Sequence, residues 1–168
     1  MKKNNSLKLL SLILILLLFA CNEAPIEPKF KYPPNNEYKV TISQGVWGNV
    51  WFWEGDFMPI IDPKYAKITP VVRNIFIYEA TRFDSVIRDS GSYSFIKSIN
   101  SNFVAEITSD KDGFFQINLP PGKYSFFVKE DSLFFANGTD GDGYIMPAEV
   151  IADKVTKRQI NINYKAVY

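Results

Sequence analysis

Apolar and polar residues alternate most clearly near the end of the chain. Between residues 160 and 166 every second side chain is apolar, in the order Ile160, Ile162, Tyr164 and Ala166, and the intervening residues are Asn or Lys. Successive side chains of a β-strand point to opposite faces of the sheet. This period of two therefore predicts a strand with one buried face and one solvated face.

The same pattern runs through residues 38–168. Short runs of Val, Ile, Phe, Tyr and Thr are separated by Gly, Pro, Asn and Asp, which are typical of turns. Residues 71–80 are apolar on both faces, which predicts a central strand. No window of about 11 residues after Cys21 carries a sustained helical stripe. We therefore expect an all-β domain over residues 38–168, an antiparallel β-sandwich of about seven strands.

Three of these strands follow one another in the middle of the chain. They cover residues 103–108, 115–119 and 124–128, and the turns between them contain Asp-Gly at 112–113 and Pro-Gly at 121–122. Gly and Pro supply the backbone angles that tight reversals need. The side chains that this alternation places in the core include Tyr124, Phe126, Ile160 and Ile162.

A family resemblance falls on the same segment. Residues 108–125, TSDKDGFFQINLPPGKYS, are similar to the T-D-x-D-G-x-F-x-I-x-L-P-P-G-x-Y hairpin of carboxypeptidase regulatory-like domains. These domains have a seven-stranded, transthyretin-like sandwich. Residues 46–50 and 75–78 could stand for the first two strands of that family. The resemblance implies an accessory module that has no catalytic residues of its own.

Two segments, residues 55–70 and 83–101, are longer than the usual turns of that family. The first carries Phe57, Ile60 and Ile61, which is enough apolar area to cover neighbouring aromatic rings. The assignment of the edge strands depends on how these two inserts fold.

The chain begins with the features of a lipoprotein export signal. A basic segment at residues 2–8 precedes an apolar run at 9–18, which is too short for a transmembrane helix. Residues 18–21, LFAC, resemble the lipobox of bacterial lipoproteins, in which a diacylglycerol is attached to the cysteine and the peptide is cut before it. This implies a signal peptide at 1–20 and a lipid on Cys21 that anchors the protein to a membrane of the bacterial envelope. We expect the outer membrane, on its periplasmic or its surface face, and the alternative is an ordinary signal peptide with a cysteine at its boundary.

Residues 21–37 separate this signal from the first strand. They include four prolines and show no apolar periodicity, which is typical of a semi-rigid spacer in the polyproline II conformation. At about 3.1 Å per residue, such a tether could hold the domain on the order of 50 Å from the bilayer.

Charge and residue inventory exclude several function classes. The 168 residues include 19 Lys and Arg against 18 Asp and Glu, so there is no basic excess for a phosphate backbone. We expect no nucleic-acid partner. Histidine is absent and Cys21 is the single cysteine, which excludes Ser-His-Asp and Cys-His catalysis, His-based metal sites and internal disulfides.

Three tryptophans are candidates for ligand binding. If Val46 and Val50 point to the core, then Trp47, Trp51 and Trp53 share the opposite face of the strand. Exposed, these indoles would form a stacking platform for sugars or a patch for a protein partner. Alternatively, a bulge at a nearby glycine reverses the register, or the apolar insert that follows folds over the rings.

A glycine-rich loop at residues 137–143, NGTDGDG, is a candidate calcium site. Asn137, Asp140 and Asp142 place three oxygen-bearing side chains within six positions, a density that calcium favours. The loop lacks the distal glutamate of an EF-hand. The alternative is an ordinary turn, and the Asp-x-Asp-Gly sequence at 110–113 likewise needs no metal to form.

Taken together, these features indicate a membrane-anchored, non-catalytic β-sandwich module that binds a glycan or an envelope protein, or serves a structural role. Calcium is the single cofactor that the sequence suggests. The rival interpretation is a lipoprotein enzyme that uses paired carboxylates, such as a glycoside hydrolase, with Glu79, Asp84 or Asp89 as acid and base. Ser94 and Lys97 match the Ser-x-x-Lys of β-lactamases, but the accompanying motifs of those enzymes are missing.

Overall fold

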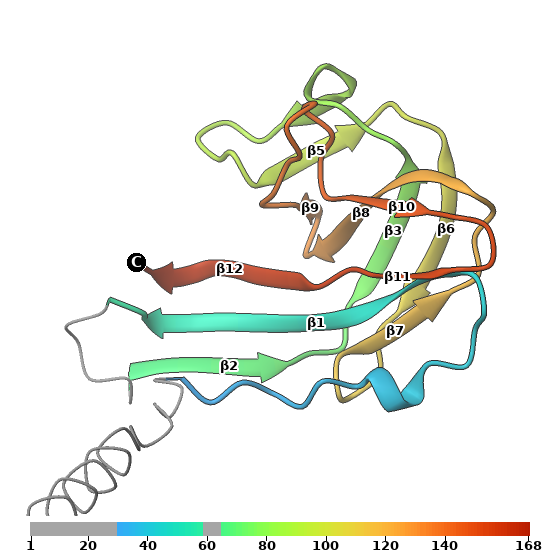
Figure 1. The fold of residues 1–168 in the computed structure, drawn as a ribbon. Coiled ribbons are helices and arrows are strands. Elements are labelled where there is room, and N and C mark those ends of the chain that lie inside the picture. The colour runs from blue at the N-terminus through green and yellow to red at the C-terminus, as the bar shows by residue number, and fades with distance from the viewer. Residues whose placement is uncertain (1–29, 59–64) are drawn as a thin grey trace, which may run out of the picture.

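The computed structural model describes residues 30–58 and 65–168. The predicted signal peptide, Cys21, Ile60 and Ile61 lie outside these residues. Two β-sheets pack face to face in the described chain, which confirms the predicted all-β sandwich (Figure 1).

The smaller sheet has five strands, and its centre is the long strand β1 (Gly45–Asp56). On one side of β1, the antiparallel strands β7 (Phe114–Ile117) and β2 (Ala66–Pro70) pair with its first and second halves. On the other side, β11 (Val155–Lys157) and β12 (Ile160–Val167) run parallel to it. The first and last strands of the domain therefore lie side by side in the same direction (Figure 1).

The larger sheet has seven strands, and all of its paired neighbours are antiparallel. Its order is β4 (Val86–Arg88), β5 (Phe95–Ile99), β9 (Leu133–Phe135), β8 (Gly122–Glu130), β3 (Asn74–Glu79) and β6 (Phe103–Thr108), with β10 (Pro147–Val150) beside β8. Two short 3₁₀ helices, η1 (Glu37–Lys39) and η3 (Phe83–Ser85), complete the described elements. The strands outnumber the expected seven because both long inserts contribute strands and several strands are only three residues long.

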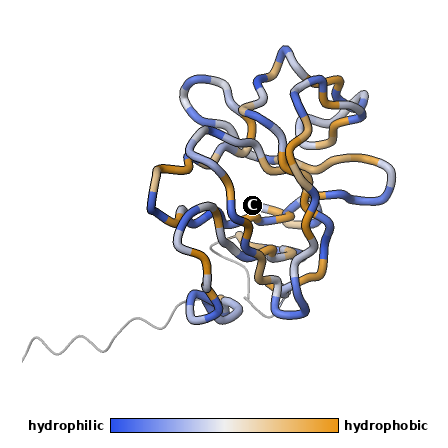
Figure 2. The backbone as a smooth tube through the Cα atoms, turned by 90° about the vertical axis from the view of Figure 1, so that its right-hand side faces the viewer, coloured by the Kyte–Doolittle hydropathy of each residue, from blue (hydrophilic) through white to orange (hydrophobic). Residues whose placement is uncertain are grey.

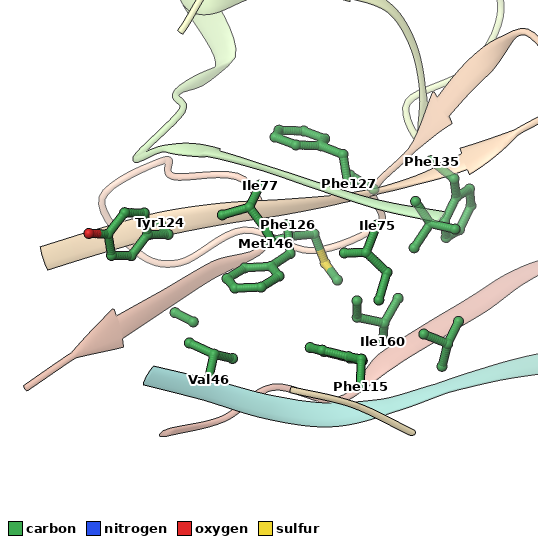
Figure 3. Packing of buried hydrophobic residues seen from close by; sticks show 14 of the residues in the cluster. Val46, Ile75, Ile77, Phe115, Tyr124, Phe126, Phe127, Phe135, Met146 and Ile160 are labelled. Atoms are coloured by element: carbon green, nitrogen blue, oxygen red, sulfur yellow. The ribbon is translucent and has the colours of Figure 1, made fainter. Parts of the chain in front are cut away.

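The core lies between the two sheets, where the alternation of side chains predicts it. Ile75, Ile77 and Phe126 of the larger sheet point toward Val46 and Phe115 of the smaller one (Figure 3). The four core residues named from the sequence, Tyr124, Phe126, Ile160 and Ile162, are all buried. Hydrophilic residues gather at the turns (Figure 2).

The predicted hairpin around Asp112-Gly113 is wrong in one respect. β6 pairs with β3 in the larger sheet, whereas β7 pairs with β1 in the smaller sheet, so this turn carries the chain across the sandwich. Gly113 has a φ of 77°, and its carbonyl oxygen accepts a hydrogen bond of 2.8 Å from the amide of Val50. A Cβ at this position would lie 2.5 Å from the carbonyl oxygen of Val50. The turn therefore packs directly against the backbone of β1, which requires glycine at position 113. The local sequence pattern does not reveal this contact.

Candidate functional site

The three tryptophans share one face of β1, as predicted, but other side chains cover this face. Trp47 is only 5% exposed. The ring of Tyr32 lies 6.2 Å from that of Trp51 and 5.9 Å from that of Trp53, and Phe57 lies 4.9 Å from Trp53. The three indoles stay on one face, and the segments before and after β1 cover Trp51 and Trp53, whereas Trp47 packs near Phe114 of β7. This arrangement weighs against an open stacking platform on β1.

The segment that supplies Tyr32 belongs to the folded domain. We call residues 30–39 the N-terminal strap. Asn36 is buried, and its amide nitrogen donates to Asn49 Oδ1 at 2.7 Å and to the carbonyl oxygen of Asp112 at 2.9 Å. The proline-rich composition predicted a tether up to residue 37, and this boundary is wrong because composition does not show that Asn36 has hydrogen-bond partners far along the chain.

The calcium candidates make other contacts. Asn137 donates to Asn163 Oδ1 at 2.7 Å and to the carbonyl oxygen of Asn161 at 2.9 Å, so its amide faces β12. Asp140 accepts the amide of Asp142 at 3.1 Å through Oδ1, and its Oδ2 lies 3.3 Å from the ammonium of Lys123. These contacts favour the ordinary turn. Within residues 30–58 and 65–168, no cluster of three or more acidic or cysteine side chains could hold a metal ion.

The carboxylates named for an enzyme have separate partners. Glu79 accepts the side-chain amide of Asn102 at 2.8 Å, Asp84 accepts the hydroxyl of Ser85 at 3.2 Å, and Asp89 pairs with Lys97 at 3.0 Å. Lys97 is thus engaged by a carboxylate, in contrast to the free lysine that activates a catalytic serine in the Ser-x-x-Lys motif.

Glu130 is the one buried carboxylate in the described chain, and no motif in the sequence marks it. Its Oε1 accepts from Arg73 Nε, and its Oε2 accepts from the hydroxyl of Tyr164 at 2.8 Å. Burial and the hydrogen bond to Glu130 raise the pKa of Tyr164 to about 12. This network joins β8 to β12 across the sandwich and satisfies the buried charge.

An open cleft lies elsewhere, between residues 83–96 and residues 136–145. It has a volume of about 200 Å³, and its lining includes Phe83, Arg88, Tyr93, Asn137, Thr139 and Ile145. Tyr93 is 88% exposed and Phe83 is 46% exposed. The insert at residues 83–101, which left the edge strands unassigned in the sequence, therefore forms one wall of this cleft.

Local hydrogen bonds hold both walls. Ser92 Oγ accepts the amides of Ser94 and Phe95 at 3.2 Å each, which shapes the tip of the β4–β5 hairpin where Tyr93 is displayed. On the opposite wall, the amide nitrogen of Asn137 is bound to β12, which leaves its carbonyl oxygen as an acceptor.

Arg88 gives the cleft its charge. Its guanidinium lies 4.4 Å from the ring centre of Phe83 and 5.9 Å from that of Tyr93. Its sequence neighbour Asp89 pairs with Lys97 instead, and no ion pair to Arg88 is formed within the described chain. The cleft thus combines two accessible aromatic rings, one cation without a carboxylate partner, and hydroxyl and amide groups.

No protein-family model, curated protein or solved structure matches this chain. None of the described helices is long and apolar enough to cross a membrane.

Proposed function

We propose that this chain is a lipid-anchored, non-catalytic β-sandwich module of the bacterial envelope that binds an acidic saccharide in the cleft. The cleft around Arg88 carries this proposal. The anchor is supported by the basic segment, apolar run and single cysteine at the start of the chain. The motif at residues 108–125 and the sandwich architecture support a carboxypeptidase regulatory-like domain.

The size and lining of the cleft favour a sugar unit. Pockets for drug-sized ligands measure about 300–1,000 Å³, so about 200 Å³ suits a single ring of an extended chain. Tyr93 and Phe83 offer faces on which a sugar ring can stack, and Ser94, Asn137 and Thr139 can hydrogen-bond to hydroxyl groups. A protein partner would more often use a broad apolar patch than a small mixed cleft.

Charge favours an acidic sugar over a neutral one. A guanidinium binds a carboxylate through two parallel hydrogen bonds, and Arg88 has no such partner in the described chain. A uronate ring would bring a carboxylate to Arg88 while its face stacks on an aromatic ring. The proposal therefore predicts that a carboxylate on the saccharide increases affinity.

The test is calorimetric titration with oligogalacturonate and with the same oligomer after methyl esterification, which removes the charge and keeps the rings. We expect binding of the acid form, weaker binding of the ester, and loss of both in Tyr93→Ala. Arg88→Gln should reduce affinity for the acid form to that for the ester. Tyr38→Ala, at another exposed tyrosine on η1, is the matched control and should bind normally.

Absence of binding across a broad array of acidic and neutral glycans would contradict the proposal and favour a protein partner. The same incubations test the rival enzyme. A lipoprotein glycoside hydrolase that uses paired carboxylates would release shortened oligomers, whereas the proposed module leaves the saccharide intact.

A further inference from the structure

We propose that one end of the sandwich docks on the lipid bilayer through a cluster of aromatic rings. This inference goes beyond saccharide binding. It rests on one part of the proposed function, the lipid anchor at Cys21. The cluster, here called the aromatic end, consists of Phe30, Tyr32, Trp53, Phe57 and Tyr168. Its proposed partner is the headgroup region of the membrane to which the protein is anchored.

The rings of the aromatic end form a continuous set. Tyr32 lies 5.9 Å from Trp53, Trp53 lies 4.9 Å from Phe57, and Phe57 lies 5.0 Å from Phe30 and 5.8 Å from Tyr168. Tyr32 and Tyr168 are 49% and 65% exposed, whereas Phe57, on which Tyr168 packs, is buried. The inner rings thus support two outer tyrosines that face solvent.

The chain enters the domain at this end. Phe30 packs on Phe57, which follows the last residue of β1, and the chain terminus at Tyr168 packs on the same ring. In Figure 1 the described chain begins beside the start of β2, and the C-terminus lies on the same side. The lipid is therefore attached to the chain that leaves this end.

The length of the remaining tether decides which end can reach the membrane. Phe30 is nine residues beyond Cys21, which corresponds to about 28 Å of extended chain at about 3.1 Å per residue. β1 has 12 residues, so its Gly45 end lies roughly 36 Å from its Asp56 end at about 3.3 Å per residue. The tether is shorter than this strand. The Gly45 end cannot be turned to the membrane while Phe30 stays packed at the other end.

The chemistry of the aromatic end suits a headgroup layer. Tyrosine and tryptophan combine an apolar ring with a polar group and are enriched at membrane interfaces. Lys31, exposed between Phe30 and Tyr32, can attract the phosphate of an anionic lipid. β5, which forms one side of the cleft, lies at the top of Figure 1, away from the C-terminus. Docking would therefore leave the cleft open to solution.

The test uses the full-length lipidated protein in vesicles of phosphatidylethanolamine and phosphatidylglycerol that contain a nitroxide-labelled headgroup lipid. A fluorophore is attached to Val167→Cys, which lies beside Tyr168 and leaves both outer tyrosines in place, and a matched control carries it at Tyr93→Cys, since both side chains are highly exposed. Cys21 does not compete for the label because its sulfur carries the lipid. We expect the nitroxide to quench most of the fluorescence at position 167 and little at position 93. Circular dichroism of the two labelled proteins checks that both keep the β-sandwich fold.

Other outcomes separate the two proposals. A protein that floats with the vesicles but shows no quenching at position 167 overturns docking and leaves the anchor intact. Equal or stronger quenching at position 93 overturns the orientation. A protein that does not float with the vesicles overturns both the lipid anchor and the docking that depends on it.

Discussion

Asp110 and Asp140 occupy the same position in two turns of matching geometry. The Oδ1 atom of each aspartate accepts the backbone amides of the residues two and four positions later, at 2.9 and 3.0 Å for Asp110 and at 3.1 and 2.8 Å for Asp140. Each turn has a glycine of positive φ three residues after its aspartate, Gly113 at 77° and Gly143 at 82°. The two Asp-x-Asp-Gly-aromatic segments therefore build one local structure twice.

A lysine from elsewhere in the chain binds each turn. Lys39 Nζ lies 2.8 Å from Asp110 Oδ2 and 5.8 Å from the centre of the Phe114 ring. Lys123 Nζ lies 3.3 Å from Asp140 Oδ2 and 4.4 Å from the centre of the Tyr144 ring. A lysine ammonium therefore pairs with the carboxylate that shapes each turn.

Lys39→Met should reduce the loss of stability in acid. Burial disfavours ionisation of Asp110, but hydrogen bonds from Lys39 and from the amides of Phe114 and Asp112 outweigh it, so the pKa of Asp110 lies below its usual 3.8. The folded state then binds fewer protons than the unfolded state, and stability falls as pH drops through this range. In the variant the pKa returns toward its usual value, so the free energy of unfolding is lower near neutral pH and changes less on acidification.

Urea unfolding at about pH 7 and about pH 3 checks this expectation. Lys97→Met, which breaks the more exposed pair with Asp89, is the control and should have a smaller effect at both pH values. An unchanged acid dependence in Lys39→Met would show that the backbone amides alone hold the carboxylate ionised.

Millimolar calcium should leave the melting temperature unchanged. Lys123 already pairs with Asp140, and the side-chain amide of Asn137 holds that residue against β12, so two of the three candidate residues at 137–142 are fixed by protein contacts and would have to move to surround an ion. A ligand that binds only the folded state raises its stability. A calcium-dependent rise in melting temperature, accompanied by a calorimetric binding heat, would establish the calcium site at Asn137, Asp140 and Asp142.

Phe126→Ala should lower the free energy of unfolding by about 3–5 kcal/mol, because it removes a fully buried ring and leaves a cavity between the sheets. Phe103→Ala is the matched control. Phe103 lies on β6 and is 56% exposed, so we expect a loss of about 1 kcal/mol or less. Similar losses in the two variants, measured by urea unfolding, would contradict the assignment of the core.

Cys21→Ser should move the protein from the membrane fraction to the soluble fraction, because the lipid is attached through that sulfur. Fractionation of cells that express the two forms, with immunoblotting, measures the change. Ser6→Ala, a substitution before the apolar run, is the control and should remain in the membrane fraction. A Cys21→Ser protein that still sediments with membranes would refute lipid anchoring.

Local patterns predicted the all-β class and the buried faces of the central strands, but not the strands of the two inserts. Alternation identified inward side chains correctly at Val46, Val50, Ile160 and Ile162, because a strand buries one face whichever strand lies beside it. Further along β12 the prediction was wrong, since Tyr164 is 41% exposed. The sequence also specified both Asp-Gly turns, since Gly113 and Gly143 adopt angles that other residues avoid.

Tertiary structure alone decided which strands and side chains meet. Alternation does not encode the sheet to which a strand belongs, so the separation of β6 and β7 into different sheets was not predictable from the sequence. Tyr32 covers two tryptophans about twenty residues further along, and the cleft joins segments whose nearest residues are 40 positions apart, Ile96 and Ala136. Such contacts depend on how the whole chain packs. The hydrophobic pattern of a strand shows which of its faces is buried, but it does not specify which other segment covers that face.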